Sequence, residues 1–276
     1  MSAKLIPIDT ELSLYVEESG HGDVTLLMVP GWTMTTEVFR HQCDFFADSQ
    51  DYRFVSFDPR AHGRSSKTAG GHFYEQHGRD LKALIDLLEL KNIVLCGWSF
   101  GTLAILSYLN QFGAGLLSGL IMLDGPPRAT GENNQTDWVT YCRDDRDRQQ
   151  EFYTMGRLRD RDSTNREFVE WMLEDKSEDS IQWLLELTRQ TPDSAAALLN
   201  ATANFLDFRD DLIALDGRLP LLYLVRKDSG EIVTRWAAEF TPNATIAALG
   251  EHMMFWERPQ QCNRLLNDFL KTCIPD

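Results

Sequence analysis

A serine inside a glycine-flanked motif could carry nucleophilic chemistry. The stretch Gly97-Trp98-Ser99-Phe100-Gly101 has the pattern G-x-S-x-G, with an apolar run before it and a helical stretch after it. In that context the turn is very tight, because a strained serine backbone packs closely only with glycines two residues to either side. The turn would lift the hydroxyl to a helix N-terminus, where free N–H groups favour a negative intermediate. We therefore predict Ser99 as a nucleophile.

A serine hydroxyl needs a general base, and one of the six histidines lies in a matching context. His252 follows the strand-like run 245–249 and precedes the last helical stretch. The carboxyl ends of parallel strands meet at one edge of a sheet, so this position would share an edge with Ser99. We predict His252 as the base. His62 follows a different strand, and we expect it mainly to support its loop.

Two aspartates compete for the role of the acid that orients this base. Asp124 ends the run 116–123, and Asp228 comes shortly after the run 219–225. Either strand end would bring a carboxylate to the same sheet edge, where it could fix the histidine tautomer and stabilise the imidazolium. We favour Asp124 and keep Asp228 as the alternative acid. Their non-catalytic roles would be capping the turn at Gly125-Pro126-Pro127 and carrying a solvated loop charge, respectively.

The negative intermediate also needs two N–H donors. Phe100 follows the nucleophile and would supply one of them. The apolar run 24–29 ends in Pro30-Gly31-Trp32, where the glycine permits a sharp turn, so Trp32 is the natural second donor. The sequence has no cluster of metal ligands and no phosphate-binding glycine fingerprint, so we expect neither a metal nor an organic cofactor.

The elements that would position these residues alternate between strand and helix. Two period-2 stretches open the chain as an expected antiparallel hairpin, and later apolar runs are typical of strands buried on both faces. The strand-like runs are 4–8, 12–16, 24–29, 54–57, 92–96, 116–123, 219–225 and 245–249. Helical spacing occupies 76–90, the stretch from the serine motif to about 111, and 260–270. This order predicts an α/β fold, with a mostly parallel central sheet and helices on both faces.

The middle of the chain follows another pattern. Residues 128–216 contain no strand-like run but many charges and several helical patterns. We predict an inserted helical lid there, on a core formed by residues 1–127 and 217–276. Some of its large apolar residues would line a pocket, while most at helical spacing would be core. These residues are Trp138, Phe152, Tyr153, Met155, Phe168, Trp171, Met172 and Trp183.

Bulk properties exclude several classes of partner. The formal charge of −15 argues against nucleic acid and against anionic membranes, which both need a basic surface. The five cysteines are odd in number and form no C-x-x-C pair, so neither a zinc site nor a disulfide framework is indicated. The N-terminal residues lack a signal-peptide pattern, and no apolar run approaches the ~20 residues of a membrane span. We expect a cytoplasmic enzyme with a small-molecule substrate.

The motifs VPGW, DPRAHGRSS, GWSFG, LDGPP and GEHMMFWERP together resemble the α/β-hydrolase superfamily, from the first buried strand to the last helix. The resemblance implies an α/β-hydrolase fold with a nucleophile, a base and two oxyanion-hole donors at Ser99, His252, Trp32 and Phe100. The acid departs from the usual pattern. Relatives place it three residues beyond a glycine after the strand matching 219–225, and this chain has Arg226 and Ser229 at those positions. Some members carry the acid at the position of Asp124.

The resemblance implies a serine hydrolase that cleaves an ester, lactone or similar acyl bond of a small to medium, largely apolar substrate through an acyl-enzyme.

Two other classes of function compete with hydrolysis. Cofactor-independent ring-cleaving dioxygenases also have the Pro-Gly-Trp turn and an acid at the position of Asp124. They differ in having histidines on either side of the serine that matches Ser99, and another histidine shortly after the Pro-Gly-Trp turn. This chain has Trp98, Phe100 and the polar stretch 33–36 instead. A ligand sensor or scaffold without catalysis is disfavoured, because Ser99 and His252 both stand in the contexts that catalysis needs.

Overall fold

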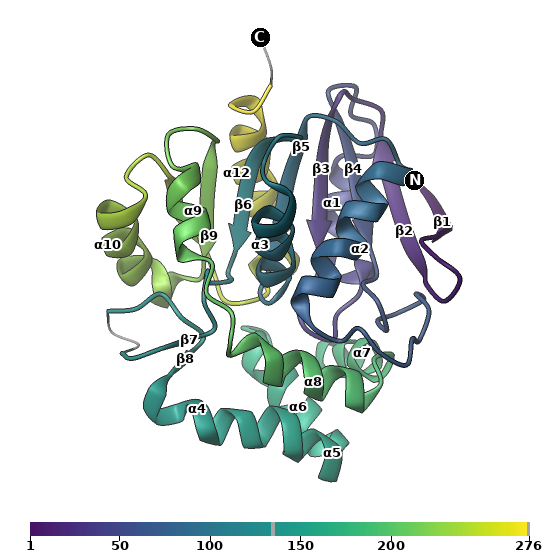
Figure 1. Ribbon diagram of the computed structural model, residues 1–276, viewed down its shortest axis with the longest axis vertical. Helices are drawn as coiled ribbons and strands as arrows, with labels where there is room; N and C mark the ends of the chain where they lie inside the picture. Colours follow the sequence, from purple (N-terminus) through teal and green to yellow (C-terminus); the bar gives the residue numbers. More distant parts are fainter. Residues whose placement is uncertain (134–135, 275–276) are drawn as a thin grey trace.

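One eight-stranded sheet runs through the computed structural model, which describes residues 1–133 and 136–274 (Figure 1). The strand order is β1-β2-β4-β3-β5-β6-β9-β10. The first two strands and the β2–β4 pair are antiparallel, and every other neighbouring pair is parallel. The strands are β1 (Ser2–Pro7), β2 (Ser13–Gly20), β3 (Val24–Val29), β4 (Tyr52–Phe57), β5 (Ile93–Trp98), β6 (Leu117–Leu123), β9 (Leu221–Val225) and β10 (Thr245–Ala248). The predicted mostly parallel sheet is confirmed.

The apolar runs lie where both faces of the sheet are covered. β3 and β5 are paired on both sides, and each of their residues is buried. β1 lies at the edge of the sheet, and most of its residues are exposed. A strand buried on both faces cannot alternate apolar and polar residues, which explains why the central strands read as continuous apolar runs.

Helices cover both faces of the sheet, as the sequence predicted. α2 and α3 pack against each other on one face, while α1 and α12 pack together on the other (Figure 1). The helices that follow or flank the sheet strands are α1 (Arg40–Phe45), α2 (Tyr74–Leu87), α3 (Gly101–Phe112), α9 (Arg209–Leu215), α10 (Gly230–Phe240), α11 (Met254–Glu257) and α12 (Pro259–Lys271), with short 3-10 turns η1 (Thr36–Phe39) and η3 (Lys227–Ser229). Within the described residues, no helix is long and apolar enough to cross a membrane.

Most of residues 128–133 and 136–216 lie beyond the carboxyl ends of the parallel strands, whereas α9, at the end of this segment, lies beside the sheet next to α3 (Figure 1). The segment comprises β7 (Thr130–Gly131), β8 (Tyr141–Cys142), α4 (Arg143–Gln150), the π-helical turn η2 (Glu151–Gly156), α5 (Arg157–Arg159), α6 (Arg161–Met172), α7 (Glu178–Arg189), α8 (Asp193–Ala203) and α9. The expectation that this segment contains no strand is wrong at one point. β7 and β8 pair in parallel over two residues each, which is too short to leave a periodicity in the sequence.

Candidate active site

The serine motif forms a sharp turn between β5 and α3. Ser99 has a φ of 53°, in the left-handed region that side chains rarely adopt. A Cβ at Gly97 would lie 2.6 Å from the backbone nitrogen of Thr102. A Cβ at Gly101 would lie 2.4 Å from the carbonyl oxygen of Val29. The two flanking glycines are therefore required by the close packing of this turn against its neighbours.

Two further glycines close around the serine, from loops distant in sequence. A Cβ at Gly31 would lie 2.9 Å from the Cβ of Ser99, and one at Gly125 would lie 2.3 Å from its carbonyl oxygen. The serine backbone also donates a hydrogen bond from its N–H to the carbonyl of Leu123 at 2.9 Å. The strained conformation is thus held by contacts from two neighbouring segments of the sheet edge, the loop after β3 and the end of β6.

His252 and Asp124 meet beside this turn. The Nδ1 of His252 lies 2.5 Å from Oδ2 of Asp124, and both side chains are buried. The other ring nitrogen of His252, Nε2, is buried and has no hydrogen-bond partner among residues 1–133 and 136–274. A small cavity of about 60 Å³ is lined by these two residues and by Ser99. A histidine that donates from Nδ1 to a carboxylate keeps a lone pair on Nε2, which can accept a proton.

The environment of Asp124 stabilises its charged form. Its φ of 43° turns the chain sharply at the end of β6, and its Oδ1 accepts the backbone N–H of Arg226 at 3.0 Å. Burial alone would raise the pKa of Asp124, but the hydrogen bond from His252 and the charges of His252 and Arg226 outweigh it and hold this pKa below its ordinary value. A buried carboxylate of this kind can orient a histidine at neutral pH.

The alternative acid lies elsewhere. Asp228 is in η3, with a side chain 69% exposed, and its carboxylate accepts hydrogen bonds from Nε of Arg226 and from the hydroxyl of Ser229. Asp228 makes no hydrogen bond to His252 in the described chain. Of the predicted site residues, the structure therefore brings Ser99, His252 and Asp124 together and leaves Asp228 at the surface.

The two predicted oxyanion donors both have free backbone N–H groups. Within residues 1–133 and 136–274, neither Trp32 N–H nor Phe100 N–H donates a hydrogen bond. Trp32 follows Gly31, which touches Ser99, and Phe100 is the N-cap residue of α3. Unpaired N–H groups at a helix N-terminus and a tight loop can receive an anionic oxygen.

His62 supports the loop that carries Trp32. Its Nε2 accepts the backbone N–H of Thr33 at 3.2 Å, and its Nδ1 lies 2.8 Å from the carbonyl oxygen of Arg60. Thr33 has a φ of 61°, so the loop is strained next to the donor. Complete burial, together with the charge of His77, lowers the pKa of His62 to about 3, which leaves the ring neutral as this pair of bonds requires. We expected His62 to support a loop, and these contacts agree with that role.

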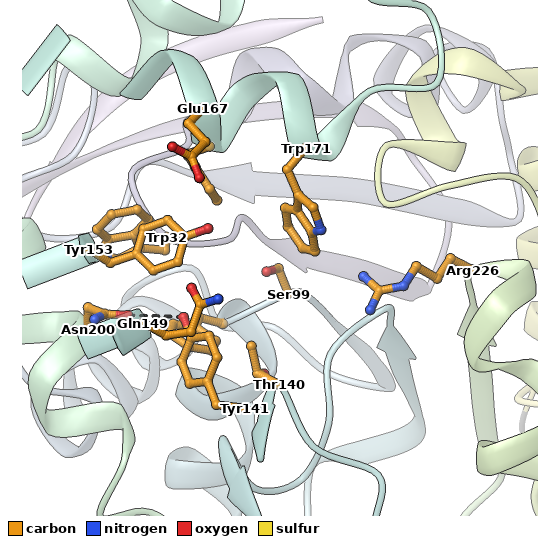
Figure 2. A pocket seen from close by; sticks show the side chains of 12 residues that line it. Trp32, Ser99, Thr140, Tyr141, Gln149, Tyr153, Glu167, Trp171, Asn200 and Arg226 are labelled. Atoms are coloured by element: carbon orange, nitrogen blue, oxygen red, sulfur yellow. Dashed lines mark hydrogen bonds between the residues drawn. The ribbon is translucent and has the colours of Figure 1, made fainter. Parts of the chain in front are cut away.

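A larger cavity of about 270 Å³ opens in front of Ser99, between the sheet edge and residues 128–216 (Figure 2). Tyr153, Phe168 and Trp171 line it, which is three of the eight large residues expected to contribute. Trp171 is 48% exposed and lies with its ring 4.7 Å from that of His252. The remaining lining residues are Trp32, Phe100, Thr140, Tyr141, Gln149, Glu167, Asn200 and Arg226.

Several of these lining residues carry no signal in the sequence. Glu167, Gln149 and Asn200 are ordinary polar residues in helical stretches, and only the packing of the helices brings them to the cavity. Arg226 occupies the position where relatives were expected to have a glycine, so that substitution was the one available clue. Of the other expected residues, Trp138 lines the small cavity, and Trp183 stacks on Trp256 with ring centroids 4.0 Å apart.

Solved structures share this fold along almost the whole chain. The bromoperoxidase from Bacillus anthracis superposes with a TM-score of 0.86 at 21% identity, covering 98% of this chain and 100% of its own. An esterase from Exiguobacterium antarcticum gives 0.82 at 24% identity, covering 94% and 96%. At these identities the likeness shows the fold alone. The fold class is that of the α/β-hydrolases.

Sequence comparison gives the family. The model of the Alpha/beta hydrolase family matches residues 26–265, so the chain belongs to this family and is a hydrolase enzyme of that class. A putative non-heme chloroperoxidase of Synechocystis sp. is 26% identical over 279 residues, covering 94% of this chain and 95% of the relative. The AB hydrolase superfamily protein YisY of Bacillus subtilis is 29% identical over 118 residues, which is 43% of each chain.

Proposed function

We propose that the protein is a serine hydrolase that cleaves an ester, lactone or similar acyl bond of a small to medium, largely apolar substrate. The observation that carries the proposal is the arrangement around His252. The Nδ1 of this ring is bound to Asp124, and its Nε2 has no partner among the described residues. His252 and Ser99 line the same cavity. Such an arrangement suits removal of a proton from the serine hydroxyl.

The proposed reaction has two halves. His252 takes the hydroxyl proton through Nε2 as Oγ of Ser99 attacks the carbonyl carbon, and the oxyanion accepts the N–H groups of Trp32 and Phe100. The tetrahedral intermediate then expels the alcohol, which takes the proton from His252 and leaves an acyl-serine. Water, deprotonated by the same nitrogen, attacks the acyl carbon, the acid departs, and the serine regains its proton. Asp124 stays ionised and stabilises the imidazolium in both halves.

Residues 128–216 act in this proposal as a lid over a core of residues 1–127 and 217–276. Trp171, Phe168 and Tyr153 of that segment line the cavity in front of Ser99, so the lid supplies its apolar wall. It would bind the body of the substrate and limit the access of water to the acyl-enzyme.

The dioxygenase-like alternative has less support. Within the described residues, His252 is the one histidine that lines either cavity next to Ser99. The indole N–H of Trp98 is bound to the backbone carbonyl of His252, and Phe100 is buried, so neither position offers a second base. Oxygen uptake with a hydroxylated aromatic substrate would favour this alternative over hydrolysis.

A fluorophosphonate probe tests the proposal directly. We expect the probe to label the native enzyme at Ser99 and to inactivate it towards p-nitrophenyl esters, because phosphonylation requires an activated serine. Ser99→Ala should not be labelled, and Ser107→Ala, a buried serine on α3 outside both cavities, serves as the matched control. Absence of labelling in the folded native enzyme would refute a serine nucleophile.

A further inference from the structure

One basic residue faces the nucleophile across the cavity. Arg226 follows β9, and its side chain lines both cavities that contain Ser99. Figure 2 shows its guanidinium turned toward Ser99, with Glu167 on α6 beyond the ring of Trp171. The backbone of Arg226 is held in place because its N–H donates a hydrogen bond to the carboxylate of Asp124.

The guanidinium is held in place but keeps free donors. Its Nε donates to the exposed carboxylate of Asp228 at 2.7 Å, and its carbon lies 5.3 Å from the ring centroid of Trp171. Nη1 is 3.5 Å from Oδ2 of Asp124, an ion pair without a hydrogen bond. In the part of the chain that the structure describes, no side-chain or backbone acceptor takes a hydrogen bond from Nη1 or Nη2.

Free donors on a planar, oriented guanidinium suit a carboxylate, which can accept two parallel N–H bonds. The side chain of Arg226 is 27% exposed, so such a pair would be screened less than one at the open surface. Its carboxylate partner Asp228 is 69% exposed and competes weakly, since exposed ion pairs contribute little. Glu167, which has no ion pair within the described residues, would repel an anion from the other side of the cavity.

We propose that Arg226 binds a carboxylate on the substrate, so that the enzyme prefers acyl compounds with an apolar body and one acidic end. This inference rests on the proposed hydrolysis at Ser99 and adds the substrate class to it. The aromatic residues Trp171 and Phe168 would contact the apolar body, while Arg226 sets the direction in which the substrate lies relative to Ser99.

Matched pairs of substrates test the inference. The first series consists of mono-p-nitrophenyl esters of straight-chain dicarboxylic acids, each beside the ester whose far carboxylate is a primary amide. A second series, 3-carboxyphenyl and 3-carbamoylphenyl acetate, puts the acid on the leaving group. In at least one series, we expect kcat/KM to be higher for the acid than for its amide. Amides favoured or equal in both series would overturn the proposal.

Variants then assign the preference to one side chain. Arg226→Met keeps an apolar stem beside Trp171 and removes the charge, and should lower the acid-to-amide ratio by about 10- to 100-fold, as expected for a charge-assisted hydrogen bond. Asp228→Asn should raise this ratio slightly, because it removes the negative charge that competes for the guanidinium, while the amide oxygen can still accept from Nε. Lys227→Gln removes the same charge from an exposed residue outside both cavities and should leave the ratio unchanged. An unchanged ratio in Arg226→Met, or an equal loss in Lys227→Gln, would refute the assignment.

A binding measurement keeps this inference separate from the proposed reaction. If no ester is turned over, the hydrolase proposal fails, and titration calorimetry with Ser99→Ala still decides the role of Arg226. The dicarboxylic acid should bind more tightly than its monoamide, and the difference should disappear in Ser99→Ala/Arg226→Met. Equal binding of the acid and the amide by Ser99→Ala would overturn the inference on its own.

Discussion

Replacing the two candidate acids separately gives the sharpest test of the site. In Asp124→Asn the amide oxygen can still accept the N–H of Arg226, which leaves the NH₂ group toward Nδ1 of His252. The ring must then accept at Nδ1 and carry its proton on Nε2, the tautomer that cannot take a proton from Ser99. We expect kcat to fall by about 10⁴-fold, the loss that follows from a wrong tautomer in a serine triad.

Asp228→Asn should behave differently. This carboxylate is 69% exposed and pairs with Arg226 at the surface, an interaction of about 0–1 kcal/mol, so kcat for a neutral p-nitrophenyl ester should change by less than about 5-fold. The assay is turnover of that ester, with circular dichroism to verify folding of each variant. If Asp228→Asn lost most of its activity while Asp124→Asn retained it, our reasoning about the acid would be wrong.

Three further predictions concern groups around the site. His62 has a folded pKa of about 3 against an unfolded value of about 6.5, so its neutral form stabilises the fold fully above pH ~6.5 and this contribution is lost as the pH falls toward 3. Between pH ~6.5 and 3, His62 should therefore lower the free energy of unfolding, measured in urea, by up to about 1.4 kcal/mol for each unit by which the pH falls. If the free energy of unfolding of His62→Gln depended on pH as steeply as that of the native enzyme, this prediction would be contradicted. Gly31→Ala puts a Cβ 2.9 Å from that of Ser99 and should lower the free energy of unfolding of the protein by about 1–3 kcal/mol, with loss of fluorophosphonate labelling at Ser99. Unaltered stability and labelling would count against the packing argument. Arg157→Met removes the buried hydrogen bonds from Arg157 to Asn165 and to the carbonyl of Thr188, while Asp193 keeps its ion pair with Arg161. The loss should destabilise the protein by about 1–3 kcal/mol, seen as a lower Tm and faster proteolysis within residues 128–216; cleavage first in the sheet would point to another role.

The strands that carry the site could be predicted because burial on both faces leaves a direct trace in the sequence. The run 24–29 coincides with β3, and the run 116–123 differs from β6 by one residue. The helix predicted over 76–90 begins two residues earlier and ends three residues earlier, since helix ends depend on capping and local turns. β8 and α10 were not predicted. β8 pairs over only two residues, and α10 begins directly after a 3-10 turn at Gly230, where no cap marks the boundary.

The choice between the two aspartates could not be made from spacing, and the fold explains why. β6 and β9 are neighbours in the sheet, so a carboxylate at either strand end lies close to the histidine loop. The structure distinguishes them by local backbone geometry. Asp124 turns inward with a positive φ, while η3 carries Asp228 outward into solvent. Neither feature follows from the residue type alone, because aspartate is common both in tight turns and in exposed loops.

An acid at the end of β6 leaves the end of β9 free for another role. When the acid follows β9, that loop must hold a carboxylate toward the histidine. Here the loop supplies to Asp124 a backbone N–H from Arg226, which does not depend on the side chain that position 226 carries, together with the ion pair of the guanidinium. The side chain at position 226 is therefore not needed for this hydrogen bond to the acid, although its charge helps to keep Asp124 ionised. In this chain it is an arginine whose free donors face the cavity, so the displaced acid and the proposed selection of acidic substrates follow from the same rearrangement of one loop.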